Sequence, residues 1–238
     1  MRDAWRHFGA EFIGTFALVF VGGAAIITSP VASPQAALLD IALAHGLILG
    51  IMISATMRIS GHLNPAVTMG FLVTRRIEPM MAVVYWIAKI FGAVIAAYAL
   101  KGLFPESVAM AARLGGQSIS ADVTLFQAMI LEAIATFFLV FVVFGTAVDP
   151  DGPKLGGFAI GLTVTAGIFA IGPLTGGSMN PARSFGPAIV SGFFDGQSVY
   201  WIGPMVGGIC AALLYDSLFL RRPPEPPDHG ALSEQTVL

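Results

Sequence analysis

The chain has 238 residues, of which 56% are hydrophobic and only 11% are charged. A soluble domain carries about 25% charged residues, so this composition favours a protein whose solvent is the lipid bilayer. The formal net charge of −2 provides no basic surface for nucleic acid. A single cysteine, Cys210, excludes a disulfide framework within the chain.

Six apolar stretches are long enough, or nearly so, to cross ~30 Å of hydrocarbon, which takes about 20 helical residues. Two further helix-like segments are too short to span. We therefore predict an all-α membrane protein with six transmembrane helices and two re-entrant half-helices. The spans are residues 8–28, 37–57, 80–103, 124–148, 155–172 and 197–220, and the half-helices are 64–74 and 180–190.

The positively charged residues between these stretches predict the orientation of the chain. Lys and Arg collect in the cytoplasmic segments of membrane proteins. With both termini in the cytoplasm, most of these residues lie inside. The inner residues are Arg2, Arg6, Arg58, Arg75, Arg76, Lys154, Arg221 and Arg222, and the outer ones are Lys101, Arg113 and Arg183.

Three regions follow one another along the chain. Residues 1–7 are predicted to be a cytoplasmic N-terminus, because the apolar run after them is too long for the core of a signal peptide. Residues 8–220 form the membrane domain. Residues 221–238 are rich in proline and polar residues, which predicts a disordered cytoplasmic tail. The short loops favour a bacterial inner membrane.

An internal repeat indicates how the spans are related. AEFIGTFALVF from Ala10 matches LEAIATFFLVF from Leu131, GHLNPAVTMG from Gly61 matches GSMNPARSFG from Gly177, and YWIAKIFGAVIAA from Tyr85 matches YWIGPMVGGICAA from Tyr200. The two halves cover about residues 8–103 and 124–220. Each half has three spans, an odd number, so the second half enters the membrane upside down. Such inverted repeats place a binding or conduction site at the midplane, where the halves meet.

Each half carries the triplet Asn-Pro-Ala at the start of its half-helix. Asn is a strong N-cap, and Pro is preorganised for the first helical position. Each half-helix therefore points the positive end of its dipole beyond its Asn, and the two ends meet near the midplane. That field repels protons and cations, while the amides can hold a water molecule. The triplets are Asn64-Pro65-Ala66 and Asn180-Pro181-Ala182, and the alternative is that both Asn only cap their helices.

These triplets, with Arg183 after the second and a glutamate in the first span of each half, resemble the aquaporin family over residues 8–220. The resemblance implies a passive channel, not an enzyme, that conducts water, excludes protons and ions, and can conduct ammonia or other small neutral solutes. It also implies a homotetramer with one pore in each subunit, and no cofactor or metal. The expected partners are these solutes and the lipid bilayer.

Two glutamates and one histidine are predicted to support the re-entrant loops. Glu11 and Glu132 lie mid-span, where an ionisable group has a function or a partner. We expect them to accept hydrogen bonds from the backbone of the loops, whose carbonyls line the pore; the alternative, a proton relay, would defeat proton exclusion. His62 is expected to brace the first loop or to lie next to a gate, and we prefer the brace. Lys89 stands where the family usually has Gln, and is expected to be neutral, to snorkel or to pair with Glu11 or Glu132.

The resemblance also implies a selectivity filter near the outer mouth, formed by His45, Ile168, Gly177 and Arg183. Arg183 stays protonated and supplies a fixed charge. The loop SGHLNPAVT is one residue shorter than the SGGH or SGAH usual in the family, and a rigid count would select Ala44 in place of His45. We prefer His45, because a buried histidine without a role is unfavourable. This set is similar to that of plant tonoplast intrinsic proteins, which implies ammonia permeation beside water.

Other functions compete with this interpretation. An ion-coupled transporter would need acidic residues at the broken helices, which present only Asn-Pro. A membrane enzyme would need a nucleophile with a base or a metal cluster, and the histidines are scattered among different elements. A glycerol-conducting relative would resemble NPARDFGP and carry a Pro-Leu pair in the last span. In those places this chain has the water-channel residues Ser184, Ala188, Tyr200 and Trp201.

Overall fold

The computed structural model describes residues 2–32, 35 and 37–220, so the predicted tail at 221–238 lies outside the described residues. Within them the regular structure is helical, and six helices are long and apolar enough to cross a membrane. The predicted fold class is confirmed. The spans are α1 (Arg2–Ala32), α2 (Ala37–Thr56), α4 (Pro79–Leu103), α6 (Leu125–Val143), α7 (Gly157–Thr175) and α9 (Gln197–Leu218), and the half-helices are α3 (Pro65–Val73) and α8 (Pro181–Ser191).

Besides shifts of a few residues at other helix ends, the structure differs from the prediction in three respects. α1 begins at Arg2, so the segment expected to precede the first span continues its helix. α6 is followed by a π-helical turn, η2 (Phe144–Val148), in place of an unbroken helix. The short helix α5 (Glu106–Ala111) and the 3-10 turn η1 (Arg113–Gly115) are absent from the prediction, because so few residues show no hydrophobic periodicity.

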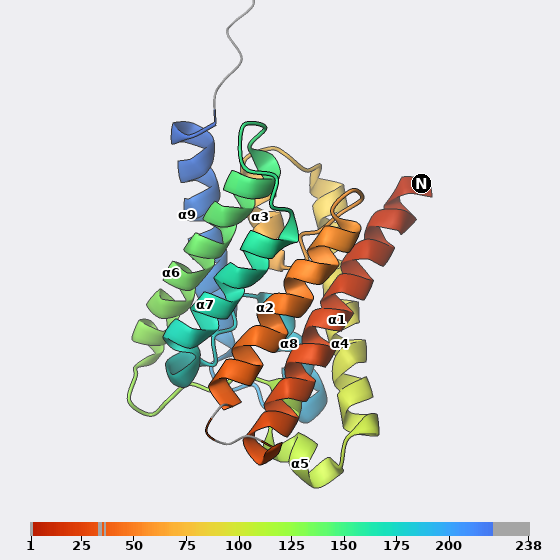
Figure 1. Ribbon diagram of the computed structural model, residues 1–238, viewed down its shortest axis with the longest axis vertical. Helices are drawn as coiled ribbons and strands as arrows, with labels where there is room; N and C mark the ends of the chain where they lie inside the picture. The colour runs from red at the N-terminus through yellow and green to blue at the C-terminus, as the bar shows by residue number, and fades with distance from the viewer. Residues whose placement is uncertain (1, 33–34, 36, 221–238) are drawn as a thin grey trace, which may run out of the picture.

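The helices pair in a way that follows the internal repeat. α1 packs on α4 as α6 packs on α9, and α2 packs against α7 across the two halves. Each half-helix contacts the last span of the opposite half, α3 on α9 and α8 on α4. Figure 1 shows α3 and α8 in opposite halves of the length of the bundle, with the start of α1 and the end of α9 at the same end. The re-entrant segments are therefore held where the two halves of the chain meet.

Glycines allow α2 and α7 to approach closely. A Cβ added at Gly50 would lie 2.9 Å from the carbonyl oxygen of Gly157, and one added at Gly161 would lie 3.0 Å from the Cα of Gly50. Small residues at a helix crossing allow this contact within a membrane, where lipid is as apolar as the side chains. The crossing of α2 and α7 therefore depends on backbone-to-backbone packing.

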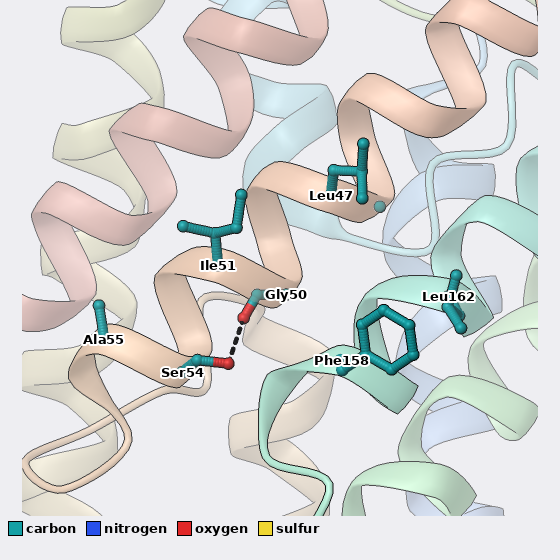
Figure 2. Close-up of a pocket in the computed structure, with 8 residues that line it drawn as sticks. Leu47, Gly50, Ile51, Ser54, Ala55, Phe158 and Leu162 are labelled. Atoms are coloured by element: carbon teal, nitrogen blue, oxygen red, sulfur yellow. Dashed lines mark hydrogen bonds between the residues drawn. The ribbon is translucent and has the colours of Figure 1, made fainter.

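A groove of about 470 Å³ lies on the outer surface beside this crossing. Figure 2 shows the lining residues Leu47 and Ile51 on α2 and Phe158 and Leu162 on the neighbouring α7. Among its lining residues the one polar side chain is Ser54, whose hydroxyl donates to a carbonyl of its own helix at 2.8 Å. The groove thus presents apolar surface to the membrane, and it is separate from the cavity described below.

Candidate functional site

Both half-helices begin with an Asn cap, as the sequence predicts. Asn64 Oδ1 accepts a hydrogen bond from the N–H of Ala66 at 2.9 Å, and Asn180 Oδ1 accepts one from the N–H of Ala182 at 3.1 Å. The proline after each Asn stands in the first helical turn, where its missing N–H leaves no bond unmade. Each helix therefore starts at its Asn, with its remaining N–H groups directed toward the centre of the molecule.

The two helix starts are tied to each other. Asn64 Nδ2 donates to the carbonyl oxygen of Met179 at 2.7 Å, and Asn180 Nδ2 donates to the carbonyl oxygen of Leu63 at 2.9 Å. Leu63 and Met179 have φ values of 48° and 52°, a left-handed conformation that is uncommon for residues with a side chain. Each amide nitrogen carries two hydrogens, so one N–H of each Asn remains for a passing molecule.

A narrow cavity runs past this meeting point. The space open to the centre of a water-sized sphere is about 10 Å³, which is close to the minimum that holds one water molecule. A solute that passes here must therefore pass in single file. The cavity is lined by Leu18, His45, Leu49, Asn64, Leu139, Val164, Ile168, Gly177, Ser178, Met179, Asn180 and Arg183.

The structure brings the residues predicted for the filter together in the wall of this cavity. His45 comes from α2, Ile168 from α7, Gly177 from the loop before α8, and Arg183 from the first turn of α8. Ala44, the alternative from a rigid count, is not among the lining residues. The four residues therefore line one cavity although the first loop is one residue short, and their role as a selectivity filter stays a prediction.

His45 and Arg183 form a hydrogen-bonded pair in the wall. Arg183 Nη2 lies 2.8 Å from His45 Nε2, and His45 Nδ1 lies 2.8 Å from the carbonyl oxygen of Ile41. A guanidinium only donates and a carbonyl only accepts, so Nε2 is the acceptor and Nδ1 carries the proton. The imidazole in this arrangement is neutral, and the positive charge of the filter belongs to Arg183.

Two residues beside the filter are not found by the sequence analysis. A Cβ at Gly22 of α1 would collide with the imidazole of His45, so this glycine makes room for the ring. Gln117, between η1 and α6, is buried, and its side-chain amide lies against the guanidinium of Arg183. With its oxygen turned toward Arg183, its nitrogen donates to Ser184 Oγ at 3.1 Å. A single sequence marks neither residue, because their importance depends on neighbours far away in the chain.

Glu11 holds the first re-entrant loop. Its carboxylate accepts hydrogen bonds from the N–H groups of His62 and Leu63, both at 2.8 Å, and from the hydroxyl of Ser60. Lys89 Nζ lies 2.9 Å from the second carboxylate oxygen. Of the alternatives for Lys89, the structure therefore shows pairing with Glu11.

Glu132 holds the second loop in a matching way. Its carboxylate accepts from the N–H groups of Ser178 and Met179 at 2.9 and 2.6 Å, and from the hydroxyl of Thr175 at 2.7 Å. The hydroxyl of Tyr200 donates to the carbonyl oxygen of Thr175 at 2.8 Å. With its hydrogen bonds taken by the loop, Glu132 is placed to support the loop rather than to face the cavity.

His62 lies against the first half-helix and is not part of the cavity lining. Its Nδ1 lies 3.1 Å from Thr68 Oγ1, and its ring centroid is 4.1 Å from that of Phe71 and 5.0 Å from that of Tyr85. The side chain thus connects the loop to both α3 and α4, and its role as a brace stays a prediction.

The residues typical of water channels lie behind the cavity wall rather than in it. The hydroxyl of Ser184 contacts that of Ser178, and Ala188 is buried on α8. Trp201 packs edge-on against Phe185, with 6.0 Å between ring centroids. Together with Tyr200, these residues pack around the second re-entrant segment and are not among the residues that line the cavity.

Comparison with known proteins agrees with this geometry. Residues 1–215 match the Major intrinsic protein family. The chain is 43% identical over 228 residues to Aquaporin TIP2-1 of Arabidopsis thaliana, covering 90% of this chain and 88% of that protein. It is 44% identical over 224 residues to Aquaporin TIP1-2 of Zea mays, covering 90% and 86%. The X-ray structure of the aquaglyceroporin from Plasmodium falciparum matches with a TM-score of 0.79 and 25% identity over 90% of this chain and 96% of that chain. This chain belongs to the Major intrinsic protein family.

Proposed function

We propose that this chain is a passive channel that conducts water across a membrane. The observation that carries the proposal is the reciprocal tie of Asn64 and Asn180 to the opposite loops. With this tie, two helix N-termini, each with a free amide N–H, lie beside a cavity whose volume is close to the minimum that holds one water molecule. Those N–H groups can bind the oxygen of a passing water and replace part of its hydration. Membership of the family and the aquaporin relatives support the same function.

The same arrangement supports the exclusion of protons and cations. Each half-helix contributes a partial charge of about +0.5 at its start, and Arg183 adds a full positive charge in the filter. A water whose oxygen accepts from both amides directs its hydrogens away from the midplane, so it cannot relay a proton onward. Exclusion then follows from the field and from the orientation of the bound water together.

The filter supports the passage of ammonia beside water. Ile168 contributes an apolar wall, and Gly177, at φ +57°, lies so close that a Cβ there would be 3.1 Å from the Cα of Ile168. Since Nε2 of His45 already accepts from Arg183, the ring offers no free acceptor to hold water. One side of the filter is therefore apolar, which favours a small neutral base as a second solute.

Glycerol conduction and ion coupling are less well supported. A cavity of about 10 Å³ suits a solute the size of water. A coupled transporter would need acidic side chains in its pathway, and the described cavity lining contains none. The carboxylate oxygens of Glu11 and Glu132 accept hydrogen bonds from the loops, so these residues are poorly placed to relay protons.

Assembly and location form a separate part of the proposal. We propose a homotetramer with one pore in each subunit, which family membership supports. For a bacterial inner membrane with both termini in the cytoplasm, the support is the short loops and the distribution of Lys and Arg. The similarity to plant aquaporins of TIP type supports a tonoplast location instead. Membrane fractionation of the source cells with an antibody to the chain distinguishes the two.

Purified protein in liposomes tests the transport proposal directly. Osmotic shrinkage measures water, and internal alkalinisation after an ammonium gradient measures ammonia, each against empty liposomes. We expect both rates to rise, and we expect His45→Phe to reduce the ammonia rate by filling the filter. Faster shrinkage without faster alkalinisation would support conduction of water and contradict conduction of ammonia. If neither rate rises in liposomes shown to contain folded protein, the channel proposal is wrong.

A further inference from the structure

Lys89 of α4 is a buried cation that the water pathway does not use. Its side chain is fully buried and absent from the cavity lining. Nζ lies 2.9 Å from Glu11 Oε2, 2.7 Å from Thr68 Oγ1 and 4.9 Å from the ring centroid of Tyr85. A buried ammonium is unfavourable unless its donors are taken. Here the contacts of the ammonium connect α4 with α1 and α3, beside the first re-entrant loop.

The second half of the repeat uses a different residue to connect its loop to its last span. The repeat aligns Tyr85 with Tyr200 and Lys89 with Pro204. Tyr200 ties α9 to its loop through the carbonyl of Thr175 at 2.8 Å. The hydroxyl of Tyr85 instead lies 2.6 Å from His7 Nδ1 on α1. The first loop and its half-helix contact α4 through the ring of Tyr85, which lies 5.0 Å from that of His62, and through Trp86 Nε1, which donates to the carbonyl oxygen of Pro65 at 3.2 Å. Lys89 adds a contact of another kind, because it bonds to Glu11 itself.

The first loop is also the shorter of the two. Ser60 is four residues before Asn64, whereas Thr175 is five residues before Asn180. Both loops nevertheless present one hydroxyl and two N–H groups to their glutamate. Glu11 alone of the two has a fourth donor, the ammonium of Lys89. The additional donor thus belongs to the loop that makes the same bonds with less chain.

We propose that Lys89 is a positioning residue for water conduction, which clamps Glu11 to Thr68 and so fixes the first re-entrant loop as Tyr200 fixes the second. Thr68 extends the clamp, because its Oγ1 lies 3.1 Å from His62 Nδ1 and 3.3 Å from the carbonyl oxygen of Asn64. Lys89 therefore acts on the pore through the placement of Asn64 and not by contact with water. The inference rests on the water conduction proposed above.

Variants of Lys89 separate the clamp from simple packing. Lys89→Met keeps an unbranched stem and removes every donor, whereas Lys89→Gln keeps an amide nitrogen with two N–H groups. We expect Lys89→Met to lower water permeability per protein by about fivefold or more, and Lys89→Gln to stay within about twofold of the wild type. Tyr98→Phe is the matched control on the same helix. The side chain of Tyr98 is 58% exposed, so this variant should also stay within about twofold of the wild type.

Hydrogen–deuterium exchange gives a local readout that holds whether or not the wild type conducts water. We expect Lys89→Met to speed exchange in residues 60–68 and to leave residues 175–184 unchanged, and Tyr200→Phe to show the reverse. If Lys89→Met does not fold, Thr68→Val removes the other end of the clamp and should give the same local loss.

The proposal is overturned if both segments lose protection together, if exchange and permeability stay at wild-type values, or if Lys89→Gln is as impaired as Lys89→Met. If liposomes that contain the wild-type protein shrink no faster than empty liposomes, the water-channel proposal is wrong. The exchange data would still decide whether Lys89 holds the first loop.

Discussion

The ring of His45 is held on three sides, and that fixes what it can offer a solute. Nδ1 is bonded to a carbonyl of its own helix, Nε2 accepts from Arg183, and Gly22 stands where any larger residue would strike the ring. A side chain with both polar atoms engaged cannot turn without breaking one of these bonds. His45 therefore contributes shape and a fixed orientation of Arg183 more than a free polar group.

Gly22→Ala tests this description. The added methyl group would push the imidazole toward the cavity, and we expect water permeability per protein to fall by about tenfold or more, because a small displacement in so narrow a site has a large effect. Gly9→Ala is the control on the same helix, since a Cβ there has no neighbour within 4 Å. Stopped-flow shrinkage of liposomes measures both. Wild-type permeability in Gly22→Ala would mean that His45 does not set the width of the cavity.

Glu132→Gln addresses the carboxylate of the second loop. An amide has only one oxygen to accept the bonds from Thr175, Ser178 and Met179, and its NH2 group would face a donor. Leaving buried donors unpaired costs about 1–3 kcal/mol each, so the thermal midpoint in detergent should fall and water conduction with it. Glu106→Gln, on the exposed surface of α5, should change neither. An unchanged midpoint for Glu132→Gln would remove its supporting role.

The residues that the sequence could predict are those whose chemistry is local. Asn64 and Asn180 cap the helices that begin beside them, so the triplets and their direction follow from a few neighbouring residues. Gly22 and Gln117 could not be found in the same way, since each matters only through a side chain brought close by folding. Lys89 lies between these cases. Its burial and its need for a partner were predictable, but the choice of Glu11 over Glu132 required the structure.

At the scale of elements, the crossing of α2 and α7 is a contact with little freedom to adjust. A Cβ on Gly161 would meet the backbone of Gly46 and Gly50, and backbone cannot rotate away as a side chain can. The spans after the first were predicted to within a few residues because each is a continuous apolar run, whereas α1 begins six residues before the predicted span 8–28 and ends four residues after it. α5 and η1 were missed because they are short and lie between spans, where length and periodicity give no signal.

Gly161→Leu should therefore force α2 and α7 apart. Overpacking a close contact costs about 1–3 kcal/mol, often more where backbone must shift, and we expect a lower thermal midpoint and poorer recovery of folded protein. Gly102→Leu is the matched control, because a Cβ at Gly102 in α4 has no neighbour within 4 Å. Equal midpoints for the two variants would show that α2 and α7 tolerate separation.

For the whole molecule, the cavity between the two halves predicts flow without coupling. Its described lining contains no carboxylate that could carry a proton or sodium ion, so the rate of water movement should depend on the osmotic gradient alone. We expect equal permeability for swelling and shrinking, and no change when a sodium gradient, a pH gradient or a membrane potential is imposed. Accumulation of a solute against its own gradient, driven by any of these, would contradict a passive channel.

The crossed bonds of the two Asn also constrain how the chain matures during synthesis. When the ribosome has made only the first half, Asn64 Nδ2 and the carbonyl of Leu63 have no partners, because Met179 and Asn180 do not yet exist. These two hydrogen bonds of the first re-entrant segment can therefore form only after the second segment has been made. A nascent chain halted between the halves should leave residues 60–68 open to labelling at an introduced cysteine, and completion of the chain should close them.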